Sequence, residues 1–323
     1  MSVPRVEFVD RAGRIRRLAL LAVVIAVLAA APAWGGRDDL RLLAEIYAYV
    51  GLGAYLLFAL TLLAGVPPLV AIPLAGAIAA VVALPVAVLL FRLRGHYFAI
   101  GTWIVAEVFR LLASQASVLG GGSGLSLPVG IVTSIAATRQ EREFLIYWVA
   151  LALVLLVLLV IVALLRSRYG LALKAIRDNE LAALSNGIDV RAVKVIVYVV
   201  TAFATAMIGA LIFLQKLRIS PDAAFSVNDW TAFVIFMTVI GGIGRIEGPI
   251  VGTLVFFALR ETLADLGTIY LMMLGLVAIV IMLAAPKGIW GMVVAWFGWQ
   301  LFPLERTVLS GEPRQRKSEP SLR

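Results

Sequence analysis

Long apolar runs without charge are the feature that most restricts the fold of this chain. The clearest extends from Phe144 to Leu165 and contains no charged residue. At 1.5 Å per residue, a helix of that length measures about 33 Å and crosses the hydrocarbon core of a bilayer. Because lipid offers the backbone no hydrogen bonds, only helices or closed barrels can span it, and the alternating strands of a barrel are absent. The sequence therefore predicts an all-α, polytopic transmembrane helical bundle.

The same pattern repeats along most of the chain, which is 62% hydrophobic, whereas soluble domains are about 45–50% apolar. Pro73 and Pro85 are expected to interrupt the third apolar segment, which membrane helices tolerate where neighbouring groups satisfy the freed carbonyls. The first segment follows a basic stretch, so a signal peptide is an alternative to a first membrane helix. We favour the helix because many spans follow it. In all we predict about 8–9 apolar segments, at 18–34, 42–65, 68–91, 95–113, 144–165, 193–214, 230–244, 249–266 and 269–286.

Basic residues give the chain a net charge of +9, but they cluster at the ends of apolar runs. Loop charges in this arrangement fix membrane orientation, so we expect membrane lipid and no nucleic acid as a partner. The rule places three stretches in the cytoplasm: a basic N-terminus at 1–17, a loop at 166–194 and an amphipathic, basic tail at 292–323. The transmembrane domain then comprises 18–291.

The number of spans conflicts with this orientation in the first half. Four predicted spans separate the central loop from the tail, which agrees with both being cytoplasmic. Five lie between the N-terminus and the loop, and an odd number would put them on opposite sides. Either one segment is not a full crossing, with 95–113 the first suspect because it contains Glu107 and Arg110, or one crossing is missing.

The residue inventory argues against an enzyme. The chain has no cysteine and one histidine, so thiolate chemistry, histidine metal clusters and a Ser-His-Asp triad have little basis. Acids and bases do not gather into a catalytic set. We therefore expect no catalytic residues, no metal and no cofactor. A G-x-x-x-x-G-K-[ST] phosphate loop is also absent from the sequence, so any ATP hydrolysis must occur on another polypeptide.

The central loop is polar but rich in helix-forming residues. Its stretch "LALKAIRDNELAALSNG" favours one or two short amphipathic helices, and Asn186-Gly187 is a good helix stop. One side is predicted to be shared by Leu173, Ile176, Ala182, Ala183 and Leu184. Such helices could lie on lipid or dock a soluble protein. Acidic residues in the loop disfavour anionic lipid, which favours the protein partner.

Several motifs resemble one transporter family. The stretch "ALKAIRDNELAALSNGIDVRAVK" resembles the coupling loop of permease subunits in bacterial ATP-binding-cassette (ABC) importers, and more narrowly that of branched-chain amino acid permeases of the LivM type. The family core is Glu-Ala-Ala-x3-Gly; here Ala182, Ala183 and Gly187 match, while the acid stands one place upstream at Glu180. "RLRGHYFAIGTWIVAEVFRLL", "GGGSGL", "VIGGIGRIEGPIVGTLVF" and "AAPKGIWGM" follow the same family in order, over about residues 90–291.

The resemblance implies a fold, a function and partners. The chain would be a permease subunit in a bacterial inner membrane, importing branched-chain amino acids or a related small amide such as urea. A related permease subunit, two cytoplasmic ABC ATPases and an external solute-binding protein would complete the complex. The coupling residues would be Lys174, Arg177, Glu180, Ala182, Ala183 and Gly187. An ion-coupled secondary transporter is the alternative; it requires an ionisable group near mid-membrane, for which Glu107 is the candidate.

Glycines and one carboxylate are the candidates for the translocation path. Gly244, Gly248 and Gly252 recur every four residues, which favours close helix packing, and Gly241 and Gly242 precede them. A broken helix lining the route is the alternative reading of the same segment. Glu107 could serve transport or merely pair with Arg110 at i+3.

One departure from the family lies near Gly51. The segment "LLAEIYAYV" runs directly into Gly51-Leu52-Gly53-Ala54-Tyr55, and the family's usual upstream motif and apolar helix are not there. We hypothesise that one family-typical segment is missing between Val50 and Gly51. If both termini and the 166–194 loop are cytoplasmic, one of the five early segments does not cross. If the N-terminus lies outside, the fused segment 42–65 crosses as one helix.

Overall fold

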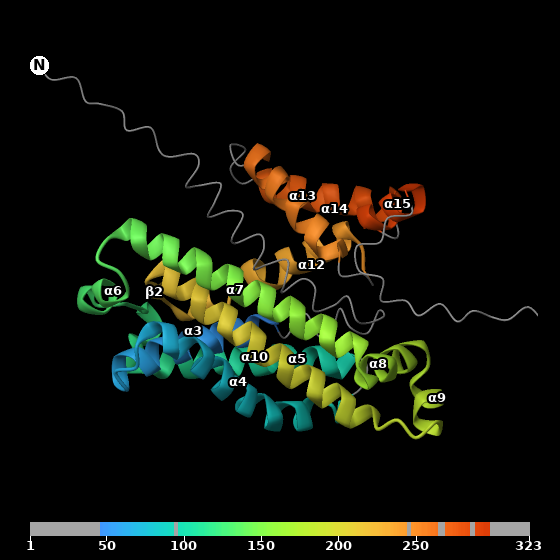
Figure 1. The fold of residues 1–323 in the computed structure, drawn as a ribbon, viewed down its shortest axis with the longest axis horizontal. Helices are drawn as coiled ribbons and strands as arrows, with labels where there is room; N and C mark the ends of the chain where they lie inside the picture. The colour runs from blue at the N-terminus through green and yellow to red at the C-terminus, as the bar shows by residue number, and fades with distance from the viewer. Residues whose placement is uncertain (1–45, 94–95, 244–246, 264–268, 285–287, 298–323) are drawn as a thin grey trace, which may run out of the picture.

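The computed structural model describes residues 46–93, 96–243, 247–263, 269–284 and 288–297 of the 323 residues. Predicted segments at 1–17, 18–34 and most of the tail lie outside these residues. The chain forms helices joined by short turns, together with two short strands (Figure 1). The long helices are α3 (Ile46–Leu63), α4 (Pro68–Leu90), α5 (His96–Gln115), α7 (Arg139–Arg166), α10 (Val190–Lys216), α13 (Glu247–Leu263) and α14 (Ile269–Ala284).

The shorter elements lie between and after the long helices. They are η2 (Ser117–Leu119), η3 (Gly121–Ser123), β1 (Leu125–Ser126), α6 (Val129–Ile135), α8 (Arg168–Asp178), α9 (Glu180–Ser185), β2 (Arg218–Ile219), α11 (Pro221–Ala224), the π-helix η4 (Asn228–Ala232), α12 (Phe233–Gly241) and α15 (Gly288–Phe297). β1 and β2 pair antiparallel, with Leu125 opposite Ile219. This two-stranded sheet was not predicted from the sequence.

Four helical runs in the described part of the chain are long and apolar enough to cross a membrane: α4, α7, α10 and Pro221–Gly241. A fifth span is formed if α5 is counted with η2 and η3, although the chain bends by 84° between Ile100–Gln115 and Ser117–Ser123. Shorter apolar helices add Tyr47–Leu63 and Met272–Ile281. The all-α polytopic membrane fold is therefore confirmed, and the bend falls at the end of the segment suspected of an incomplete crossing.

Helix α7 is the longest span and extends beyond its predicted bounds. It begins at Arg139 rather than near residue 144 because Thr138 and Glu141 form a capping box. The Thr138 hydroxyl accepts a bond from the Glu141 N–H at 3.2 Å, and the Glu141 carboxylate accepts one from the Thr138 N–H at 3.1 Å. These bonds satisfy two backbone donors that a helix start leaves open, so polar residues can join the helix.

Helix α4 continues through both of its prolines, where the sequence predicted interruption. Its buried side is a line of alanines at every fourth position, all fully buried: Ala71, Ala75, Ala79, Ala83 and Ala87. Pro73 and Pro85 lie on the exposed side. Because the small side chains carry the packing on one face, the prolines are placed where their rings meet no neighbouring helix.

Helix α10 lies at the centre of the bundle and contacts α3, α4 and α7 (Figure 1). Its approach to α3 is so close that a Cβ at Gly53 would collide with the Ala206 carbonyl, and one at Gly209 with the Val50 carbonyl. Glycine at both positions permits backbone contact between helices. Helix α3 runs without a break through Val50 and Gly51, which agrees with the fused arrangement of the 42–65 segment.

The end of the bundle that carries β1 and β2 is shaped by glycines. Gly120, Gly121 and Gly124 all have positive φ, at 84°, 52° and 77°. A Cβ at Gly124 would also collide with the Ile219 carbonyl of β2. The stretch "GGGSGL" therefore turns tightly, and it lies at the opposite end of the bundle from α8 and α9 (Figure 1).

Candidate functional site

The predicted coupling segment forms two helices, α8 and α9, between α7 and α10. Ser167, Asn179 and Asp189 occupy the N-caps of α8, α9 and α10, and each side chain accepts a bond from a backbone N–H in the following first turn. The Asn179 and Asp189 bonds measure 3.0 and 2.9 Å. Such caps satisfy open backbone donors and define where each helix begins. The polar residues of this loop therefore specify its shape.

Gly187 ends α9 in the way that the sequence predicted. Its φ is +79°, a conformation that side chains disfavour. Gly187 N–H donates to Leu184 O at 3.0 Å and Ile188 N–H to Ala183 O at 3.1 Å, the two bonds of a Schellman motif. The Asn186 side-chain amide adds a bond to Ala182 O at 2.7 Å.

The residues predicted for coupling lie on this helix pair, with different exposures. Arg177, Glu180, Ala182 and Gly187 are exposed, Lys174 is half-buried and Ala183 is buried. Of the predicted apolar side, Leu173 and Ile176 are half-buried and Ala183 is buried, whereas Leu184 is 50% exposed. The prediction that these apolar residues share one buried side is therefore only partly correct. The helix is interrupted at Asn179, so α9 does not continue the face of α8.

Two contacts connect the segment to its neighbours. Glu180 Oε2 lies 2.9 Å from Lys194 Nζ of α10. Where α7 turns into α8, a Cβ at Gly170 would collide with the Leu165 carbonyl. Exposed on the segment are the side chains of Leu171, Leu181 and Leu184. About half or more of each of these side chains is exposed to the surroundings.

Replacing Asn179 with alanine should loosen α9 without unfolding the protein. The change removes the bond to the Ala182 N–H, and loss of such a cap costs about 1 kcal/mol. Amide hydrogen exchange over residues 180–186 should quicken about five-fold, while exchange in α10 stays unchanged. Equal acceleration in α10 would show that the cap stabilises more than α9.

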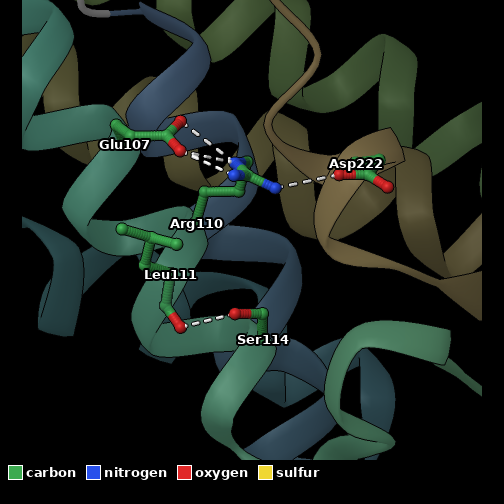
Figure 2. A network of polar contacts seen from close by, with 5 residues as sticks. All are labelled: Glu107, Arg110, Leu111, Ser114 and Asp222. Carbon is green, nitrogen blue, oxygen red and sulfur yellow. Dashed lines mark hydrogen bonds and ion pairs between the residues drawn. The ribbon is translucent and has the colours of Figure 1, made fainter.

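Glu107 belongs to a network of three charged residues that Figure 2 shows. Arg110 Nη2 lies 2.6 Å from Glu107 Oε1, and its Nε lies 3.0 Å from Oε2. Arg110 Nη1 lies 3.0 Å from Asp222 Oδ1 of α11. The i,i+3 pairing that the sequence left open is present. Sequence reasoning missed Asp222, which is 112 positions away in the chain.

This network is only partly covered by the chain. The side chains of Glu107, Arg110 and Asp222 are 44%, 32% and 86% exposed. Around them on α5, Trp103, Ile104, Val108, Leu111 and Leu112 are exposed as well. Charges are rarely placed against lipid without a function or a partner. The network joins α5 to α11 near the end of the bundle that carries β1 and β2.

The predicted glycines join α12 to α13 by backbone contact. A Cβ at Gly241 would collide with the Gly248 carbonyl, one at Gly248 with the Gly242 carbonyl, and one at Gly252 with the Met237 carbonyl. Gly288 of α15 lies against Gly242 in the same way. Gly244 falls outside the described residues. The described glycines of this segment are therefore in close backbone contact, as small-residue packing predicts.

Two details of the same region departed from expectation. Helix α13 already includes Glu247, two residues before Pro249, where the predicted segment began. Glu247 itself is buried, with 4% of its surface exposed, and this burial was not predicted. The three predicted sets of residues do not converge. They occupy α8–α9, the α5–α11 contact and the α12–α13 contact (Figure 1).

In the described ranges, no group of three or more His, Cys, Asp or Glu residues is placed to hold a metal ion.

Comparison with known proteins supplies the family. A family model described as "Branched-chain amino acid transport system / permease component" matches residues 46–286. The chain is 29% identical over 263 residues to the high-affinity branched-chain amino acid transport system permease protein LivM of Escherichia coli, covering 75% of this chain and 61% of that protein. It is 28% identical over 293 residues to the protein of the same name from Salmonella typhimurium, covering 84% and 66%.

More distant similarity extends to sugar permeases. The ribose import permease protein RbsC of Bacillus subtilis is 32% identical over 168 residues, covering 51% of this chain and 46% of that protein. The chain spans about two thirds or less of the length of the curated relatives that it matches. No solved structure matches it.

Proposed function

Because the chain belongs to the branched-chain amino acid transport system permease family, we propose that it is a permease subunit of an ABC importer. It carries leucine, isoleucine or valine across the inner membrane of a bacterium. The similarity to LivM proteins over most of the chain supports this proposal most directly. Bacterial relatives and apolar helices support the location.

The α8–α9 segment is the docking surface for the ATPase subunits in this proposal. Its exposed leucines supply an apolar anchor, and its caps and Schellman motif hold that anchor in one conformation. A preformed surface loses little conformational freedom on binding. The sequence has no recognisable phosphate loop, which is consistent with ATP hydrolysis on two separate cytoplasmic subunits.

A related permease subunit and an external solute-binding protein complete the proposed complex. The α5 face with its half-exposed charges suits contact with another protein better than contact with lipid. Transport would proceed by alternating access, with the ATPases favouring one arrangement of the helices over another. The glycine contacts of α12 and α13 are proposed to keep these helices packed as one unit during that change.

Uptake by reconstituted vesicles tests the function. The chain would be co-expressed with a related permease and ATPases, placed in vesicles and supplied with the solute-binding protein. Radiolabelled leucine should accumulate only with ATP, and should continue when ionophores collapse the ion gradients. Uptake that stops with the gradients while ATP is retained would contradict the proposal. Ribose serves as the comparison solute because ribose permeases are among the relatives.

A further inference from the structure

One face of α3 buries hydroxyl groups that form no hydrogen bond within the described part of the chain. Tyr47 and Tyr55 are 4% and 6% exposed, and the hydroxyl of neither has a partner. Gly51 lies midway between them, so the three positions follow one side of the helix at four-residue spacing. Buried polar groups are normally paired, because an unmade bond there is unfavourable. Two unpaired phenols on one face therefore require an explanation.

A third tyrosine of the same helix behaves in the ordinary way. The hydroxyl of Tyr49 donates to that of Tyr198 at 2.9 Å, and Tyr49 is 3% exposed. Burial of tyrosine in α3 is therefore compatible with a paired hydroxyl. Among the three tyrosines of α3, the hydroxyls without a partner are those of Tyr47 and Tyr55.

Phe225 covers this face. A Cβ at Gly51 would collide with its ring and lie 2.7 Å from the ring Cζ, so glycine is what lets the ring sit there. The same ring stacks on Tyr55, with centroids 6.0 Å apart and planes 24° apart. The Phe225 ring thus lies against Gly51 and Tyr55, and an apolar ring offers no hydrogen-bond partner to a buried hydroxyl.

The segment that carries Phe225 is irregular. It connects α11 to the π-helix η4, and π-helical turns occur frequently at functional sites. In η4 the hydroxyl of Thr231 is also buried without a partner, and η4 contacts α3. Unpaired hydroxyls thus occur on both sides of the contact between α3 and this segment.

Charged groups of both signs border the same region. Asp222 of α11 and Glu107 of α5 are joined through Arg110. Phenol donors, carboxylates and a guanidinium together complement a small zwitterion, whose carboxylate accepts hydrogen bonds and whose ammonium group is attracted to acids.

We propose that the α3 face formed by Tyr47, Gly51 and Tyr55 is a solute-contacting surface of the permeation route, covered by Phe225 in this conformation. Movement of the α11–η4 segment lifts the ring from Gly51. Each phenol then donates a hydrogen bond to water, or to the carboxylate of a small zwitterionic solute as the solute passes it along this face. The choice of solute rests on the proposed function, whereas the opening of the face does not.

Thiol labelling tests the opening directly. The chain has no cysteine, so a single introduced thiol is the only one in this subunit. In the assembled complex, the Tyr55→Cys variant should react with a membrane-impermeant maleimide at least ten times faster in one nucleotide state than in the others. The Leu57→Cys variant is the matched control, because Leu57 is fully buried on α3 two positions away. It should stay unreactive in every state.

Conservative substitutions test the contact with solute. Tyr47→Phe and Tyr55→Phe each remove one hydroxyl that has no partner, so thermal stability should be unchanged or slightly higher. The KM for leucine should rise about five-fold for each variant, the effect of one lost hydrogen bond. Tyr49→Phe should do the reverse, lowering thermal stability because its bond to Tyr198 is lost, with the KM unchanged.

The two experiments separate this proposal from the function on which part of it rests. If the complex imports ribose instead of amino acids, the proposed function fails, while state-dependent labelling at position 55 still supports the opening of the face. If labelling at position 55 never exceeds that at position 57, the proposal is overturned whatever the solute. An unchanged KM in both phenylalanine variants overturns the contact.

Discussion

Replacing Gly252 with valine should prevent α12 and α13 from packing, with a loss of about 3 kcal/mol or more of stability. A Cβ at this position would collide with the Met237 carbonyl and lie 2.8 Å from the Gly241 nitrogen. Both obstacles are backbone atoms, which cannot move aside as a side chain end can. Folded protein recovered in detergent, measured by fluorescence-detected size exclusion, should fall at least ten-fold.

Gly275 provides the matched control on α14. A Cβ there would meet nothing within 4 Å, so Gly275→Val should be recovered at the level of the unmodified chain. Equal losses in both variants would mean that valine itself, rather than the contact, is harmful. Normal recovery of Gly252→Val would contradict the backbone contact between the two helices.

The double substitution of Leu181 and Leu184 by glutamate should abolish docking of the ATPase subunits. The two side chains are 77% and 50% exposed, so the change should alter the stability of the isolated chain by no more than about 0.5 kcal/mol. In the complex, however, carboxylates would be buried in place of apolar anchors, at a cost of several kcal/mol. ATPase subunits should no longer co-purify, and ATP-driven uptake should fall at least 100-fold.

Val129→Glu is the control at the other end of the bundle. Val129 is 77% exposed on the short helix α6, so it receives the same chemical change on an equally exposed surface. ATPase subunits should co-purify with this variant as usual. Retention of the ATPases by the Leu181 and Leu184 double variant would exclude α9 as their docking surface.

The spans were predictable because the length of an apolar run fixes the length of a membrane helix. The segment at 144–165 became α7, and 68–91 became α4 with a shift of one residue at its end. The first turn of α7 was missed because a capping box, rather than hydrophobicity, begins the helix. The prolines of α4 were misjudged since a local rule does not say which side of a helix is packed.

The candidate sites were predictable only where their chemistry is local. Asn186-Gly187 ended α9 as expected, because a glycine that follows a helical segment commonly adopts the positive φ that ends a helix. Asp222 meets Arg110 only after the chain has folded back over 112 positions. The unpaired state of Tyr47 and Tyr55, beside a paired Tyr49, depends on what each ring faces. No periodicity carries that information.

The geometry of α10 has a mechanical consequence. Its 27 residues form one helix about 40 Å long without a proline. The first turns are tied to α9 through Lys194, and the last residue, Lys216, lies over the rings of Phe213 and Trp230 at 4.9 and 5.0 Å. Helix α10 therefore has no break at which its two ends could move independently. A displacement of the α9 end of this helix would therefore be passed along one continuous element to Trp230, whose indole N–H donates to Ala223 O at 2.9 Å in the segment that precedes Phe225.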